Sequence, residues 1–81
     1  MTRLEQRKNS VEKTLKDFNI PYVTECDRRF FKIKYQGIKL TLEVTNKYIS
    51  ITNRKMNHGY GYFEGVTDFR KCIEEGNSLI D

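Results

Sequence analysis

The chain has 81 residues and a formal net charge of +4 at pH 7, from 15 Lys and Arg against 11 Asp and Glu. This length fits one small domain, residues 1–81, with a thin hydrophobic core and no deep pocket. No apolar run approaches the roughly 18 residues that span a membrane, and the N-terminus lacks the apolar core of a signal peptide, so we expect a cytoplasmic protein with no membrane partner.

The first predicted element is an amphipathic helix over residues 2–18. Its apolar stripe follows the helical period: Leu4, Val11, Leu15 and Phe18. Asn19 tolerates the left-handed conformation that ends a helix, and Pro21 excludes its continuation. The basic side chains expected to be exposed on this helix are Arg3, Arg7, Lys8 and Lys13. We expect them to be solvated, with contact to a phosphate backbone as the alternative.

The turn between Leu4 and Val11 in this helix is polar. The first turns of the helix are therefore expected to extend past the rest of the domain, which leaves pairing with a second copy open.

From residue 22 onward the apolar period changes to two, which predicts an antiparallel meander of three or four strands. The expected strands are residues 22–26, 29–35, 38–45 and 48–53. Turn-forming dipeptides separate the last three: Gln36-Gly37 and Asn46-Lys47. Two-residue turns at these dipeptides place Ile33 opposite Leu40 and Val44 opposite Ile49, so that the apolar pairs share one face.

Residues 54–65 contain three glycines and no helical period, which predicts a loop, with a loop plus a short edge strand as the alternative. A second helix is expected over residues 67–75, with Thr67 or Asp68 as its N-cap and Gly76 as its stop. Residues 76–81 form a tail. Cys26 and Cys72 lack the spacing of a metal or redox motif, and we expect both to be reduced thiols in the core.

Together these elements predict an α+β fold, a two-layer sandwich in which an N-terminal and a C-terminal helix cover one face of the sheet. The order α-β-β-β(-β)-α resembles that of double-stranded-RNA-binding domains and of small HicA-type ribonuclease toxins. Asp68, however, lies in the stretch 65–71 where the first family has a Lys-rich motif, and the predicted strands carry no catalytic His for the second. The chain is assigned to neither family.

The other face of the predicted sheet has no element left to cover it. Lys34 lies directly opposite Lys39 on this open face, a like-charge pair that favours a bound anion. With Lys32 beside them and with Phe30 and Tyr48 at the margins, the face combines ammonium groups for phosphates with aromatic planes for bases. The alternative is an ordinary solvated face whose charge prevents aggregation through the sheet edges.

The loop over residues 54–65 is a second candidate site. Arg54 and Lys55 would extend the basic face, because they directly follow the last predicted strand. The other candidates would anchor a protein partner: His58, Tyr60, Tyr62 and Phe63. The alternative is that Tyr60, Tyr62 and Phe63 fold back as core or as a strand.

No catalytic arrangement, metal-ligand spacing or nucleotide-binding glycine pattern occurs, so we expect no enzyme, no metal and no cofactor. The leading hypothesis is a non-enzymatic binding module for nucleic acid or a nucleoprotein complex. The alternative is an inhibitor or adaptor directed at a host protein, such as a phage protein that blocks a host enzyme or a CRISPR defence system. The chain has no Ala and is rich in the residues that AT-rich codons specify, which favours a low-GC bacterium or its phage.

Overall fold

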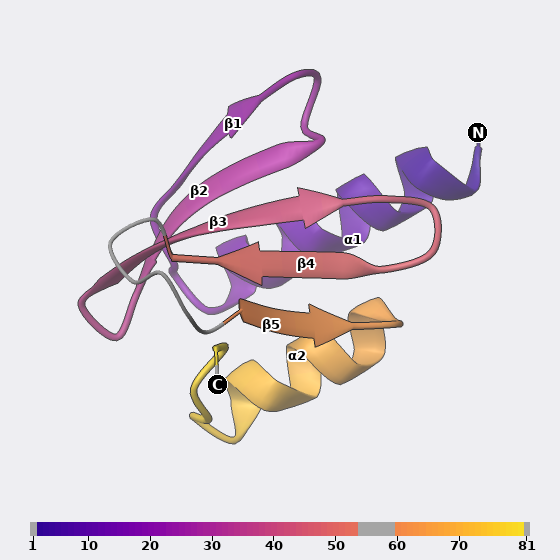
Figure 1. Cartoon of the computed structure of the whole chain (residues 1–81). Coiled ribbons are helices and arrows are strands. Elements are labelled where there is room, and N and C mark those ends of the chain that lie inside the picture. Colours follow the sequence, from indigo (N-terminus) through magenta and orange to yellow (C-terminus); the bar gives the residue numbers. More distant parts are fainter. Residues whose placement is uncertain (1, 54–59, 81) are drawn as a thin grey trace.

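The computed structural model describes residues 2–53 and 60–80, and Figure 1 shows a single sheet with an N-terminal and a C-terminal helix. The elements in chain order are α1 (Arg3–Asp17), β1 (Tyr22–Glu25), β2 (Phe30–Tyr35), β3 (Ile38–Val44), β4 (Ile49–Thr52), β5 (Tyr60–Phe63) and α2 (Val66–Glu74). All neighbouring strands are antiparallel, in the order β1-β2-β3-β4-β5. The predicted α+β class is confirmed, but the sheet has five strands where three or four were expected.

The bounds of α1 follow from its local chemistry. The Thr2 hydroxyl accepts a hydrogen bond from the Glu5 backbone N–H at 3.1 Å, which caps the first turn. Asn19 has a φ of 55°, as predicted for the residue that ends the helix, and the Ile20 N–H bonds the Leu15 carbonyl at 2.9 Å. The helix therefore ends where its last carbonyls find partners.

The two predicted hairpin registers are confirmed. Ile33 pairs with Leu40, and Val44 pairs with Ile49. The strand over residues 22–26 also forms, and β1 pairs with β2 so that Thr24 lies opposite Phe31.

The prediction of a loop throughout residues 54–65 is wrong for residues 60–63, which form β5. Gly61 pairs with Ile51 and Phe63 with Ile49, so β5 extends the sheet beside β4. The alternative of a loop plus a short edge strand is therefore the correct one.

The core lies between the sheet and both helices. Its buried hydrophobic side chains are Val11, Leu15, Ile20, Phe31, Ile33, Leu40, Leu42, Val44, Ile49, Ile51, Phe69, Ile73 and Leu79. They come from α1, α2, one face of the sheet, the segment between α1 and β1 and the C-terminal tail, so the two helices cover the same face. Each of these side chains stabilises the fold by roughly 1.5–3 kcal/mol relative to full exposure.

The start of α2 differs from the prediction. The helix begins at Val66 with Gly65 as its N-cap, and no side chain caps it. Thr67 and Asp68 thus lie inside the first turn. There the negative charge of the Asp68 carboxylate interacts favourably with the positive end of the helix dipole and stabilises the helix. The predicted end of the helix at Gly76 is confirmed, since Gly76 follows the C-cap Glu75 and has a φ of 71°.

The cysteines differ from one another. Cys72 is half-buried and packs against the core, but Cys26 is exposed, so the prediction of a core thiol is wrong for Cys26. Cys26 is the first residue of the turn between β1 and β2 and has a φ of 52°. Its side chain therefore does not follow the alternating pattern of β1, which would have directed it into the core.

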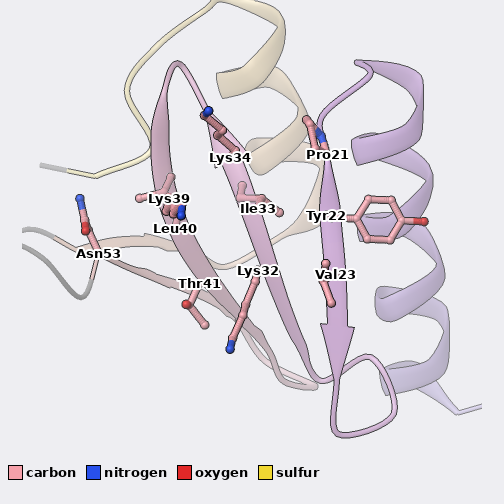
Figure 2. Close-up of a pocket in the computed structure, with 10 residues that line it drawn as sticks. All are labelled: Pro21, Tyr22, Val23, Lys32, Ile33, Lys34, Lys39, Leu40, Thr41 and Asn53. Atoms are coloured by element: carbon pink, nitrogen blue, oxygen red, sulfur yellow. The ribbon is translucent and has the colours of Figure 1, made fainter.

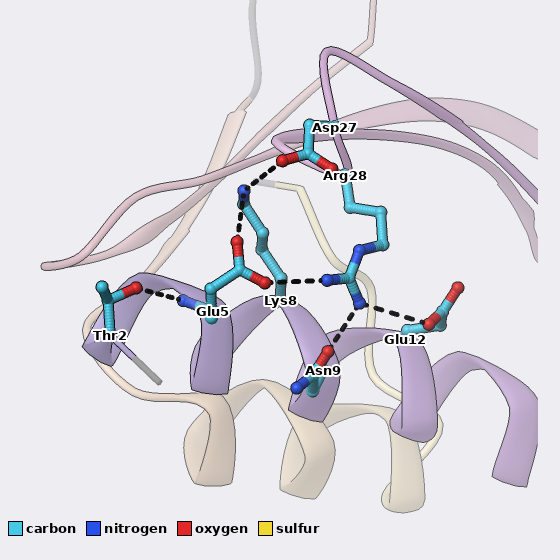
Figure 3. A network of polar contacts seen from close by, with 7 residues as sticks. All are labelled: Thr2, Glu5, Lys8, Asn9, Glu12, Asp27 and Arg28. Carbon is cyan, nitrogen blue, oxygen red and sulfur yellow. Dashed lines mark hydrogen bonds and ion pairs between the residues drawn. The ribbon is translucent and has the colours of Figure 1, made fainter.

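A cluster of ion pairs joins α1 to this turn (Figure 3). Lys8, which was expected to be exposed, is only 3% exposed. Its ammonium lies 3.2 Å from a Glu5 carboxylate oxygen and 3.6 Å from one of Asp27. Arg28 donates to Glu5 at 2.9 Å and to the Asn9 side chain at 2.5 Å. The polar turn of α1 therefore packs on the β1–β2 turn, which removes the argument for pairing two copies through α1.

Candidate functional site

The face of the sheet opposite the helices carries the predicted basic residues. Antiparallel pairing aligns its side chains in rows that run across the strands. The row nearest the β2–β3 turn is Lys34 and Lys39. The middle row is Val23, Lys32, Thr41 and Thr52. The row nearest the β1–β2 turn is Glu25, Phe30, Glu43, Ser50 and Tyr62. We call this surface the open face.

A groove of about 430 Å³ lies over β1, β2 and β3 (Figure 2). Lys32 and Lys34 project from β2 and Lys39 from β3, with Val23 of β1 on one side and Asn53 on the other. The groove thus combines three ammonium groups with apolar side chains at its β1 border.

The three lysines are not electrostatically equivalent. The Lys32 ammonium lies 2.8 Å from a Glu25 carboxylate oxygen, in an ion pair that sequence analysis did not predict. Lys34 and Lys39 are exposed, lie directly opposite one another and have no carboxylate partner among residues 2–53 and 60–80. Positive charge without a counter-charge is therefore concentrated at the end of the groove near the β2–β3 turn.

The predicted aromatic residues lie toward the other end of the open face. Phe30 is flanked in its row by Glu25 and Glu43. Tyr48 stacks on Tyr62, with ring centroids 5.2 Å apart and an angle of 29° between the planes. Phe30 and Tyr48 thus lie apart from Lys34 and Lys39. The Tyr48–Tyr62 pair was missed because it depends on the register of β5.

The predicted loop residues have different outcomes. Arg54, Lys55 and His58 lie outside the described residues, although Asn53, which lines the groove, directly precedes the first two. Tyr62 lies on the open face and is 51% exposed. Phe63 points to the other side, with its ring edge-on to Phe69 at 5.8 Å, and so serves the core rather than a partner.

Tyr60, the remaining predicted anchor, belongs to β5 and lies opposite Thr52. Of the predicted basic residues on α1, Arg3 and Lys13 are exposed. Arg7 instead turns toward the β3–β4 turn and donates from Nε to the Thr45 carbonyl at 2.8 Å. A continuous basic face on α1 is therefore not formed.

Two groups with shifted pKa values are Tyr22, which lines the groove, and Cys72 of α2. Burial, followed by a hydrogen bond to Glu12, raises the pKa of Tyr22. Burial, and then the negative charge of Glu75, raises the pKa of the Cys72 thiol. Cys72 is therefore protonated at neutral pH and is a weak nucleophile.

Within the described part of the chain, no group of three or more His, Cys, Asp and Glu side chains could hold a metal ion. Neither of the two described helices is long and apolar enough to cross a membrane. Comparisons with protein-family models, with curated proteins and with solved structures gave no match.

Proposed function

We propose that this protein is a non-enzymatic binding module that engages nucleic acid through the groove on its open face. The observation that carries the proposal is the Lys34–Lys39 pair, which places two exposed like charges side by side without a carboxylate partner in the described chain. The repulsion between the two ammonium groups destabilises the free protein slightly. A phosphate bound between them would attract both groups and outweigh this repulsion.

The surroundings of the pair support a polyanion. The chain leaves the sheet at Asn53 beside the groove and continues directly into two more basic residues, Arg54 and Lys55. The acids of the open face lie in the row farthest from the pair, at Glu25 and Glu43. A phosphate backbone entering at the β2–β3 turn would thus meet positive charge first.

Charge reversal in the groove tests this proposal. The variant Lys34→Glu/Lys39→Glu is compared with Lys13→Glu/Lys71→Glu, which changes the net charge equally at exposed positions on the helices. Fluorescence anisotropy with labelled single- and double-stranded DNA and RNA, over a range of salt concentrations, gives the affinity and its salt dependence.

We expect the groove variant to lose at least tenfold in affinity. On duplex DNA the slope of log K against log salt should become shallower by about 2, because each phosphate contact contributes about 0.9. The helix variant should retain most of the affinity. Equal losses in the two variants, or no binding of the unmodified protein to any of the four probes, would contradict the proposal.

A second candidate function is an inhibitor or adaptor that binds a protein. The stacked Tyr48–Tyr62 pair favours it, because a half-exposed aromatic pair on an open sheet face is a typical anchor for a protein partner. The measurement is an affinity purification from a low-GC bacterial lysate treated with nuclease. For this function, we expect a stoichiometric protein that is lost with Tyr62→Ala but retained by Lys34→Glu/Lys39→Glu. Material that disappears with nuclease would contradict it.

A further inference from the structure

The outer edge of β1 is an unpaired sheet edge. β1 is the outermost strand at one side of the sheet, and β2 is its only strand neighbour in the described structure (Figure 1). Val23 projects from β1 on the open face and is 65% exposed, a large value for an apolar side chain in a strand. This edge therefore presents both free backbone groups and apolar surface.

The direction of these backbone groups follows from the register. The Lys34 N–H donates to the Pro21 carbonyl at 3.3 Å, so the backbone groups of Pro21 point toward β2. Because hydrogen-bonding direction alternates along an antiparallel strand, Val23 and Glu25 also point toward β2. The N–H and C=O groups of Tyr22 and Thr24 consequently point outward, where no strand receives them.

We propose that two copies of this chain pair through β1, antiparallel, about a two-fold axis at Val23. This axis places Tyr22 opposite the partner's Thr24, and Thr24 opposite the partner's Tyr22. Each such pair can exchange both of its hydrogen bonds, since these are the residues whose backbone groups point outward. A two-fold axis between Val23 and Thr24 would place Thr24, whose backbone groups point outward, opposite the partner's Val23, whose backbone groups point toward its own β2. That register would form fewer hydrogen bonds between the two copies.

The side chains fit the same arrangement. The two Val23 side chains meet on the open face as a non-hydrogen-bonded pair, whose Cα atoms lie about 4.5 Å apart. Pro21 is compatible with this contact because its backbone points toward β2, so the dimer needs no N–H from it. Glu25 lies next to the partner's Pro21, and the partner's Lys34 follows about 4.8 Å further across the sheet. The Glu25 carboxylate, which pairs with Lys32 of its own chain at 2.8 Å, thus lies in the same row of the joined sheet as the ammonium of the partner's Lys34.

The size of the contact sets its strength. Each copy contributes only the four residues of β1, so the interface is smaller than the roughly 1,200 Å² of a stable complex. We expect a weak dimer with a dissociation constant in the micromolar range or above. This inference does not depend on nucleic-acid binding.

Disulfide trapping tests the register. In a Cys26→Ser/Cys72→Ser background, Val23→Cys places two thiols at the symmetric position, within the range of Cα distances that a disulfide spans. Thr24→Cys is the matched control, because its symmetric neighbour is Tyr22, and Lys13→Cys on α1 reports random collisions. Under mild oxidation we expect Val23→Cys to form linked dimers at least ten times faster than either control. Equal rates in the three variants would overturn the proposal.

Sedimentation equilibrium gives a second readout. The unmodified protein should self-associate with rising concentration, and Thr24→Pro should remain monomeric, since proline removes an outward N–H that β2 does not use. Circular dichroism verifies that Thr24→Pro is folded. An unmodified chain that stays monomeric up to about 1 mM, or association that persists in folded Thr24→Pro, would each refute pairing through β1.

Discussion

Gly61 has a role that depends on the C-terminal tail. A Cβ at this position would lie 1.8 Å from the Leu79 carbonyl oxygen, which is backbone and cannot move aside cheaply. Leu79 itself is 2% exposed, and the Tyr35 hydroxyl donates to the Asn77 carbonyl at 3.2 Å. Leu79 therefore closes the core at β5 only because residue 61 has no side chain. The sequence shows the glycine but not the reason for it, since the contact joins residues far apart in the chain.

The substitution Gly61→Ala should destabilise the protein by about 1–3 kcal/mol, because the tail must shift and expose Leu79. Gly65→Ala is the matched control, since a Cβ there would meet its nearest atom, a carboxylate oxygen of Asp68, at an ordinary 3.9 Å. Urea unfolding followed by circular dichroism measures both. The control should lose less than about 1 kcal/mol, because Gly65 is the N-cap of α2 and Ala is less favourable there. A similar loss at both positions would show that the tail does not hold β5.

At the scale of elements, the turn between β1 and β2 has an unusual backbone. Cys26, Asp27 and Arg28 are consecutive non-glycine residues with φ values of 52°, 54° and 65°. Each such residue costs roughly 1–2 kcal/mol relative to a right-handed conformation. The ion pairs from α1 to Asp27 and Arg28 offset part of this cost (Figure 3).

A pair of variants separates the strain from the ion pairs. Arg28→Ala and Arg28→Gly both remove the guanidinium group that contacts Glu5 and Asn9. Only glycine also relieves the backbone at a φ of 65°, so Arg28→Gly should be more stable than Arg28→Ala by about 1 kcal/mol. Thermal and urea unfolding give the difference. Equal stabilities would mean that the turn relaxes to another conformation once Arg28 is lost.

The elements differed in how far the sequence could predict them. The β2–β3 and β3–β4 hairpins were predictable because short turns and strict alternation admit one register with all apolar residues on one face. β5 was only an alternative, because its Gly61 lacks a side chain and a stretch with no clear period precedes it. A turn at Asp27 and Arg28 was predicted between the first two strands, but its run of three left-handed residues was not, since none of them is Gly or Asn.

At the scale of the whole molecule, the candidate site was predictable in part for the same reason. Lys34 and Lys39 lie on one hairpin, so its register alone brought them together. The Lys32–Glu25 ion pair depends on how β1 pairs with β2, and the Tyr48–Tyr62 stack depends on β5. Contacts set by a single tight turn could be derived, and contacts set by the placement of separate elements could not.

The strand order has a further consequence for how the protein folds. Every strand pairs with its neighbour in sequence, so the sheet can assemble by successive local steps that each close a short loop. The two helices meet only through residues far apart, as in the 2.9 Å ion pair between Asp17 and Arg70. During synthesis from the N-terminus, we expect α1 and the strands β1 to β4, with the Lys34–Lys39 pair already in place, to emerge before α2 is available to complete the core.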